Sequence, residues 1–262
     1  MTRAEWLPDE EPVVGATGEL SRAGVDELEA AVATAGGSLV YGDVKHVLES
    51  EPTVVVAIGR SALSAVARVR SQNGSGTETG PPVVPIATGP GIATPPVDGL
   101  ADIIPDILGG AGTDTTLPVL SVTIGGHPCG SALFQVTLVT DEPARISEYS
   151  LRAHREHLAQ FRADGVTVAT PVGSHGYAST AGGPLLSTAV DAVVAVPIAP
   201  FVTHGRQWIL PDDDLEITVE RNETDVVCQL DDALVGPVDL ATPVRISVTE
   251  AEPLTIVIPP TE

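Results

Sequence analysis

The segment Thr53–Ile58 constrains the fold of this chain more than any other, because it reads TVVVAI and carries apolar residues on both faces of a strand. Uninterrupted β-branched runs of this length are typical of parallel strands that helices cover on both sides. The run continues through Gly59, Arg60 and Ser61 into an alanine-rich stretch that ends near Arg70, which predicts a helix. A strand, a short turn and a helix in this order indicate an α/β sheet.

The sequence around this unit repeats the alternation of helix and strand. Apolar residues between Val25 and Ala35 recur at near-helical spacing, and Gly36-Gly37 ends that pattern. The further elements that we expect are a strand at Ser38–Tyr41, a helix near Val44–Leu48, a polar loop at Ser71–Gly80 and a strand at Pro82–Ala87. Residues 1–115 are therefore predicted to form a small Rossmann-like α/β domain.

From about Thr116 the pattern changes to short apolar segments separated by turn residues. These segments are Leu120–Ile124, Leu133–Thr140, Val166–Ala169, Ala192–Val196, Leu215–Val219, Val226–Leu230, Val244–Val248 and Leu254–Ile258. Such spacing predicts an antiparallel sandwich or barrel-like sheet. We expect residues 116–262 to form this β-rich domain, with one helical interruption near Gly176–Leu186.

The charge balance indicates the environment of the protein. Thirteen basic residues stand against 35 acidic ones, which gives a net charge of −22, and Lys45 is the only lysine. A composition with scattered acidic residues and few lysines resembles that of haloarchaeal cytoplasmic proteins. Such proteins stay hydrated in molar salt, where repulsion between charges is screened. An acidic surface that binds a partner is the alternative. The composition disfavours a basic nucleic-acid-binding face, because no cluster exists beyond Arg152 and Arg155.

Two further features limit the class of protein. No apolar run approaches the roughly 18 residues that a membrane-spanning helix needs, so we expect a cytoplasmic protein without a membrane partner. Cys129 and Cys228 are the only cysteines, and two are too few for a disulfide framework. We expect both to be reduced thiols.

The best candidate ligand site is the segment Asp164–Pro184, which reads DGVTVATPVGSHGYASTAGGP. A buried strand leads into a loop rich in glycine, serine and threonine, where backbone N–H groups can approach an anion closely. Asp164 adds a carboxylate and Tyr177 an aromatic edge. The alternative is an ordinary connecting loop, because most loops of this composition bind nothing.

The same residues carry a resemblance to a known family. Thr170–Tyr177 (TPVGSHGY) and Ser179–Pro184 (STAGGP) resemble the TPTGSTAY…SAGGP segment of NAD kinases. Similar flanking positions are Asp164-Gly165, Pro197–Pro200, Arg206, Ile209–Pro211 and Asp231. The resemblance covers about residues 131–232, and over the first half it is only architectural.

The resemblance implies a fold and a ligand. NAD kinases have an N-terminal α/β domain and a β-rich C-terminal domain, hold NAD between them, and are usually dimers or tetramers. They transfer a phosphoryl group from ATP or polyphosphate to the 2′-hydroxyl of the adenine-side ribose. By resemblance, Asp164 would lie near the nicotinamide end and Tyr177 and Thr180 along the diphosphate and adenine path. The full NAD-binding set that the resemblance implies is Asp164, Thr170, Gly173, Ser174, His175, Gly176, Tyr177, Thr180, Gly182 and Gly183.

The catalytic motifs of the family are changed in this chain. Gly59-Arg60 stands in the place of GGDGT, so Arg60 replaces the aspartate that activates the ribose hydroxyl. Phe134-Gln135 replaces an Asn-Glu pair, Pro85–Gly89 replaces GINTG, and His175 replaces a threonine. Arginine does not deprotonate in proteins and cannot act as a general base.

Two functional hypotheses follow. The favoured one is a degenerate paralogue that binds NAD(P) or another nucleotide without efficient phosphoryl transfer, with no covalent cofactor. The alternative is an active kinase that uses Mg²⁺ with ATP and takes Asp164 as its base. A different reaction on the same scaffold is a further possibility.

Other candidates are weaker. His154 and His157 would lie at i, i+3 on a helix as metal ligands, but a solvated helix face explains them better, so we expect no metal site. Ser174 and His175 as a nucleophile and its base lack the nucleophile-elbow pattern. The Asp212–Asp214 run fits a hydrated turn better than a cation site.

The net charge of −22 generates a prediction about salt. We expect thermal denaturation to show a higher melting temperature in molar KCl than in dilute buffer, because screening relieves repulsion among the acids. Equal stability in both solutions would instead mean that the acidic surface serves a partner.

Overall fold

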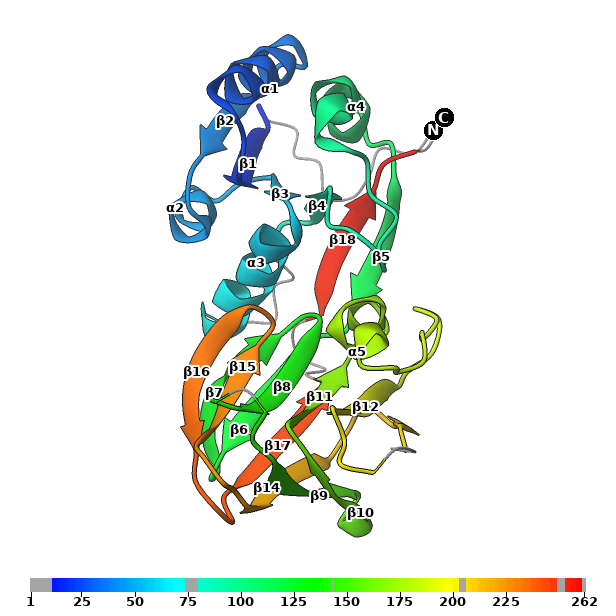
Figure 1. Ribbon diagram of the computed structural model, residues 1–262. Helices are drawn as coiled ribbons and strands as arrows, with labels where there is room; N and C mark the ends of the chain where they lie inside the picture. Colours follow the sequence, from blue (N-terminus) through cyan, green and yellow to red (C-terminus); the bar gives the residue numbers. More distant parts are fainter. Residues whose placement is uncertain (1–10, 74–79, 143, 203–205, 249–252, 261–262) are drawn as a thin grey trace. The chain divides into compact units, whose positions relative to one another are not determined.

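The computed structural model describes residues 11–73, 80–142, 144–202, 206–248 and 253–260 (Figure 1). The chain divides into two compact units, of which the first comprises Met1–Leu117 with Glu252–Glu262 and the second Pro118–Ala251. Within the described ranges, no helix is both long enough and apolar enough to cross a membrane.

The first unit is built on a six-stranded sheet with the order β2-β1-β3-β4-β18-β5. Its strands are β1 (Val13–Gly18), β2 (Ser38–Tyr41), β3 (Val54–Ile58), β4 (Val83–Ile86), β5 (Thr113–Leu117) and β18 (Leu254–Ile258). Its helices are α1 (Arg22–Thr34), α2 (Val44–Glu49), α3 (Arg60–Asn73), the 3₁₀ turn η1 (Val97–Gly99) and α4 (Leu100–Leu108). All neighbouring pairs are parallel except β18 and β5. The expected α/β domain is confirmed.

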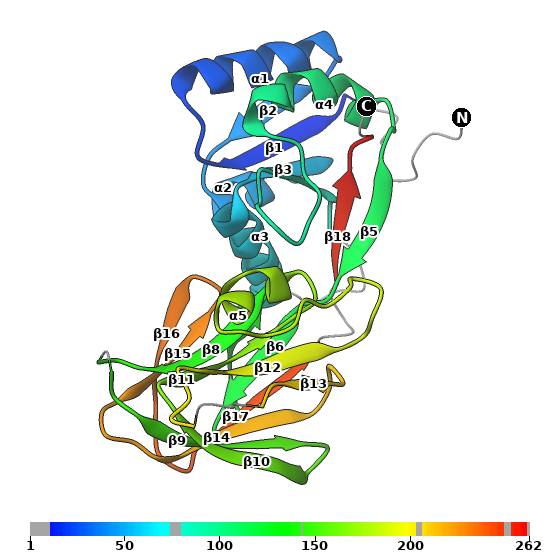
Figure 2. The same ribbon diagram turned by 45° about the vertical axis from the view of Figure 1, so that its right-hand side comes forward.

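Helices cover both faces of this sheet. Helices α1 and α4 pack together on one face, and α2 and α3 lie on the other (Figure 2). All five residues of β3 are buried, as its uninterrupted apolar run predicts. The chain turns into α1 at Ser21, whose hydroxyl accepts a hydrogen bond from the Gly24 N–H, and into α2 at Asp43. This arrangement fixes the carboxyl ends of the parallel strands at one edge of the sheet.

The structure differs from the sequence expectation at both ends of this unit. Strand β1 was not anticipated, because its sequence VVGATG contains two glycines that weaken the strand pattern. The segment Leu254–Ile258, expected in the β-rich half, pairs with β4 and β5 in this sheet. Of the expected loop Ser71–Gly80, residues 74–79 lie outside the described ranges, and α3 runs to Asn73.

The second unit contains two six-stranded antiparallel sheets, with the orders β10-β9-β14-β17-β6-β7 and β13-β12-β11-β8-β15-β16. The first sheet comprises β6 (Leu120–Ile124), β7 (His127–Ala132), β9 (Ser147–Ala153), β10 (Glu156–Ala163), β14 (Leu215–Arg221) and β17 (Pro243–Val248). The second comprises β8 (Gln135–Thr140), β11 (Gly165–Ala169), β12 (Val193–Ile198), β13 (Trp208–Leu210), β15 (Val226–Leu230) and β16 (Ala233–Val238). The β-rich fold expected for the second half of the chain is confirmed.

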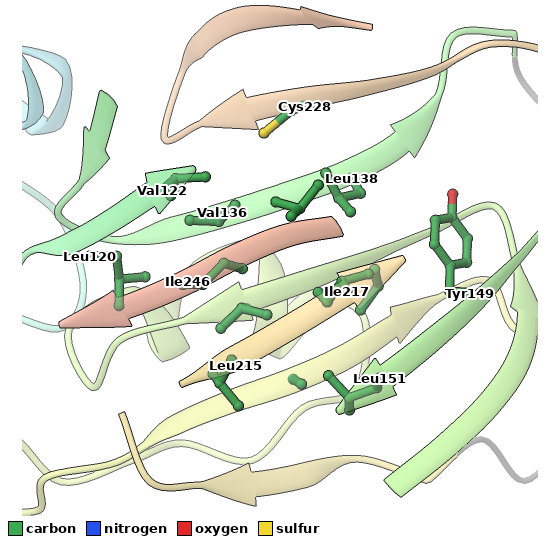
Figure 3. Packing of buried hydrophobic residues seen from close by; sticks show 14 of the residues in the cluster. Leu120, Val122, Val136, Leu138, Tyr149, Leu151, Leu215, Ile217, Cys228 and Ile246 are labelled. Carbon is green, nitrogen blue, oxygen red and sulfur yellow. The ribbon is translucent and has the colours of Figure 1, made fainter. Parts of the chain in front are cut away.

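One apolar cluster fills the space between these two sheets (Figure 3). Leu138 from one sheet and Leu151 and Ile217 from the other are essentially inaccessible to solvent. Tyr149 is also fully buried, and burial raises the pKa of its hydroxyl well above the usual value. Cys228 lies in the same cluster, where burial raises the pKa of its thiol to about 12. Cys129 and Cys228 are both free thiols.

The segment around His154 corrects one expectation. His154 and Arg155 have positive φ angles of 48° and 65°, and they form the turn between β9 and β10. The interpretation of His154 and His157 as neighbours on a helix was therefore wrong. His154 Nε2 lies 3.3 Å from Asp213 Oδ1 at the surface. No group of three or more potential metal ligands occurs among the residues that the structure describes.

Candidate functional site

The glycine-rich loop after β11 covers the outer face of the second sheet of unit 2. It contains a 3₁₀ turn, η2 (Gly173–His175), and a single helical turn, α5 (Tyr177–Thr180), rather than the longer helix expected near Gly176–Leu186. Ala178 and Leu186 pack against residues of β11 and β12 in a small buried cluster. The loop is therefore fixed to the sheet through its own apolar side chains.

Thr170 connects the loop to the segment before β8. Its N–H donates a hydrogen bond to the Phe134 carbonyl oxygen at 2.9 Å. Its hydroxyl lies 2.8 Å from the Leu133 carbonyl oxygen and 3.2 Å from that of Phe134, and it accepts a hydrogen bond from the Gly173 N–H at 3.1 Å. Because Thr170 is completely buried, these bonds are shielded from water.

Gly173 makes the closest approach in this region. A Cβ atom on Gly173 would lie 1.7 Å from the Phe134 carbonyl oxygen, a distance that no side chain tolerates. Gly183 is similarly enclosed, since its Cβ would lie 2.6 Å from Val196 and 2.8 Å from the Ala178 carbonyl oxygen. Both glycines are therefore required by the packing of the protein against itself.

Ser174 is also committed to the loop. Its hydroxyl donates a hydrogen bond to the Pro171 carbonyl oxygen at 2.7 Å and accepts one from the Leu186 N–H at 2.9 Å. The residue is fully buried. Because both bonds are made inside the protein, the Ser174 hydroxyl is not available to act as a nucleophile with His175 as its base.

The outward side of the loop is formed by a smaller set of residues. Tyr177 is 42% exposed, Thr180 and Gly182 are exposed, and His175 and Gly176 are half-buried. Gly182 has a φ of +87°, and its carbonyl oxygen accepts a hydrogen bond from Gln207 Nε2 at 3.0 Å. These residues are the ones that a ligand can reach, and they offer an aromatic ring, a hydroxyl and an imidazole.

Asp164 lies at the opposite end of β11 from Thr170. It immediately precedes the strand, and its backbone bonds with Ile198 and Thr140 at 3.0 and 2.9 Å. Thr170 follows the other end, so the two residues are separated by about 20 Å at roughly 3.3 Å per residue. Asp164 and the start of the loop therefore cannot hold the same small chemical group within one copy of this unit.

Gly59 and Arg60 lie in unit 1 at the carboxyl end of β3. Gly59 has a φ of +88° and donates its N–H to the Ile86 carbonyl oxygen at 2.8 Å, while Arg60 is the first residue of α3. The chain leaves β1 toward β2 on one side and leaves β3 toward β4 on the other. Such a switch between neighbouring parallel strands is where open α/β sheets bind ligands.

Unit 1 also contains a cavity that is lined by acidic and apolar residues. This cavity of about 330 Å³ lies beside the start of α1 and the turn η1. Leu20 and Leu28 line it together with three carboxylates, Glu19, Glu27 and Asp98, and none of its lining residues is basic. The carboxylates disfavour a phosphate there by like-charge repulsion.

Asp231 has no role assigned from the sequence, and the structure places its carboxylate against the segment Leu133–Gln135, which also bonds the glycine-rich loop. Asp231 has a positive φ of 54° in the turn between β15 and β16. Its carboxylate accepts hydrogen bonds from the N–H groups of Leu133, Phe134 and Gln135 at 2.9, 2.8 and 2.8 Å. Two signals in the sequence pointed to it: the similarity of this position to the NAD kinases, and the residue type, because a residue in a left-handed turn is often Asp.

Comparison with known proteins supports the resemblance of the second half. A profile of the ATP-NAD kinase C-terminal domain matches residues 134–257. An NAD kinase of Methanosarcina acetivorans is 38% identical over 104 residues, which are 40% of this chain and 38% of the relative. An NAD kinase of Methanospirillum hungatei is 31% identical over 183 residues, which are 67% of this chain and 64% of the relative. The chain thus spans less than two thirds of these relatives.

Solved structures share the fold over nearly the whole chain. Yeast NADH kinase in complex with NADH matches with a TM-score of 0.78 and 16% identity, covering 95% of this chain and 84% of that one. An NAD kinase from Archaeoglobus fulgidus in complex with ATP matches with a TM-score of 0.74 and 19% identity, covering 93% and 92%. An α/β unit followed by a β-rich unit with this loop defines a protein of the NAD kinase fold. Together with the sequence matches, this fold supports membership of the NAD kinase family.

The position of Gly173 generates a prediction about stability. We expect Gly173→Ala to destabilise unit 2 by about 3 kcal/mol or more, because the methyl group forces the loop away from the Phe134 carbonyl oxygen. Chemical denaturation followed by circular dichroism measures this change.

Gly126→Ala is the matched control in the same unit. Gly126 has a φ of +83° and open space around its Cβ position, so only backbone strain of about 1 kcal/mol opposes the methyl group. A cost at Gly173 no larger than that at Gly126 would contradict the steric explanation.

Proposed function

We propose that this protein is a degenerate member of the NAD kinase family that binds NAD(P) or a related nucleotide without efficient phosphoryl transfer. The observation that carries the proposal is Arg60, which begins α3 at the carboxyl end of β3 where the family has its catalytic aspartate. Arginine stays protonated and cannot accept the proton of an attacking hydroxyl. It remains able to bind a phosphate, so ligand affinity can persist without the base.

The glycine-rich loop supports the binding part of this proposal. It keeps the family's glycines, and its outward residues Tyr177, Thr180 and His175 offer an aromatic ring and hydrogen-bonding groups. The solved relatives were crystallised with NADH and with ATP, which favours NAD(P) and ATP as the ligands to test. Mg²⁺ enters only with ATP.

The alternative is an active kinase that makes NADP from NAD and ATP or polyphosphate. The names of the relatives favour it, since all those compared are kinases. Its candidate base is Asp164, which is half-buried at the far end of β11 from Thr170. That separation weighs against Asp164 acting together with Thr170 of its own copy.

Self-association forms a second part of the proposal. Ile209 is 58% exposed on the edge strand β13, and Phe201 and Val202, which follow β12, are 64% and 66% exposed. An open strand edge with exposed apolar side chains pairs readily with a copy of itself. We propose a homo-oligomer, a dimer or tetramer, that forms through β13. We also propose that the protein works in a salt-rich cytoplasm, where the salt screens its net charge of −22.

The proposal predicts ligand binding without turnover. In molar KCl, millimolar NAD or NADP should raise the melting temperature, because a ligand that binds only the folded state stabilises it. Tyr177→Ala should reduce that shift. With ATP or polyphosphate and Mg²⁺, an enzymatic assay for NADP should detect no product.

Two results would overturn this prediction in different ways. No melting shift with either dinucleotide would remove the nucleotide-binding proposal. Turnover near the common enzymatic range of about 1 per second would establish the active kinase instead. Asp164→Asn would then identify the base if it abolished that activity.

The edge strand predicts an oligomer that one charge disrupts. In molar KCl we expect light scattering to show a dimer or larger assembly, and Ile209→Asp to shift it toward the monomer. Leu234→Asp is the matched control, since Leu234 is 66% exposed on β16 at the opposite edge of the same sheet. A monomeric wild-type protein, or an equal effect of both substitutions, would contradict the β13 interface.

A further inference from the structure

The segment Leu133–Gln135 is the support on which the glycine-rich loop rests. Leu133 and Phe134 are 0% and 1% exposed, so every backbone polar group there needs a partner inside the protein. Thr170 bonds the carbonyl oxygens of this segment, and Gly173 packs directly on the Phe134 carbonyl oxygen. The position of the loop is therefore set by the position of this support.

Asp231 holds the support from its other side. Its Oδ2 accepts the Leu133 N–H, and its Oδ1 accepts the N–H groups of both Phe134 and Gln135. Its own N–H donates to the Gln135 carbonyl oxygen at 2.9 Å, so the residue is bound to the segment through backbone and side chain. Hydrogen bonds to a carboxylate are stronger than those between neutral groups, and three converge on this one.

We infer that Asp231 is a positioning residue for the candidate ligand loop. It acts through Phe134 on Thr170 and Gly173, and these residues place the outward side chains Tyr177 and Thr180. The turn between β15 and β16 and the loop after β11 are thus mechanically connected through one carboxylate. The effect on ligand affinity rests on the proposed function, whereas the effect on loop order does not.

Two substitutions test this connection with different severity. Asp231→Asn keeps the volume and tolerates the positive φ, and its amide oxygen can still accept from Phe134 and Gln135. The NH₂ group of the asparagine then faces the Leu133 N–H. Since both groups are donors, this hydrogen bond is lost and the two groups repel each other. Asp231→Gly keeps the backbone conformation and removes all three bonds.

Asp214 provides the matched control. It is an exposed aspartate in the same unit with a positive φ of 48°, and it precedes β14. Asp214→Asn and Asp214→Gly therefore make the same changes of residue type at a position of similar positive φ, and they leave the hydrogen bonds of Leu133–Gln135 intact.

The first measurement is amide hydrogen exchange in the ligand-free protein. We expect the Thr170 and Gly173 amides to exchange about tenfold faster in Asp231→Asn and faster still in Asp231→Gly, because their acceptors lose a fixed position. Amides of β9 and β14 should be unchanged, and both Asp214 variants should match the wild type. Unchanged exchange at Thr170 and Gly173, or an equal rise throughout unit 2, would overturn the inference.

The second measurement is the dissociation constant for NADP in molar KCl. We expect Asp231→Asn to weaken binding about tenfold, the effect of one lost charged hydrogen bond, with Asp214→Asn unchanged. Unweakened binding in a variant whose loop exchanges faster would overturn the role in ligand positioning. If the wild-type protein binds neither NAD nor NADP, the proposed function fails, and the exchange experiment still decides whether Asp231 orders the loop.

Discussion

The second unit depends on one constraint, which is that the buried backbone before β8 must find all its hydrogen-bond partners inside the protein. Strand pairing cannot supply them, because Leu133 and Phe134 precede the point where β8 joins its neighbours. The Asp231 carboxylate, in the turn between β15 and β16, accepts hydrogen bonds from the N–H groups. Thr170, in the loop after β11, donates hydrogen bonds to the carbonyl oxygens. Three segments far apart in the sequence are thereby fixed to each other at the same end of one sheet.

Much of the fold could be predicted where one face or both faces of a strand are apolar. The run in β3 and the segments at β6 and β15 appeared in the structure with nearly the expected bounds, since burial dictates their composition. Strand β10 was missed because half of its sequence EHLAQFRA is polar, without strict alternation, and the strand lies half-exposed at a sheet edge. His154 and Arg155 were misread because spacing alone does not distinguish a helix from a hairpin turn with positive φ.

The glycine-rich loop could be picked out from the sequence as a candidate site, which stays a prediction, but the hydrogen bonds and packing of its residues could not. A glycine that admits a ligand and a glycine that admits the protein's own backbone look the same in a sequence. Gly173 is of the second kind, and Ser174 and Thr170 use their hydroxyls inside the loop. The partnership with Asp231 was beyond sequence reasoning, because the bonded residues lie 96 to 98 positions away. Such long-range bonds become visible only when the sheet is assembled.

The distribution of positive charge bears on what the protein retains of its family's chemistry. Helix α3 carries Arg60, Arg68 and Arg70 and no acidic residue, in a chain with only 13 basic residues. Arg70 is largely buried, its guanidinium donates to the Pro81 carbonyl oxygen, and burial lowers its pKa to about 10. Arginine is suited to such a buried place because its planar guanidinium donates in fixed directions to backbone oxygens. Arg60 at the start of the same helix is a donor of the same kind and cannot accept a proton, so this end of β3 offers an anion a positive charge and offers a hydroxyl no base.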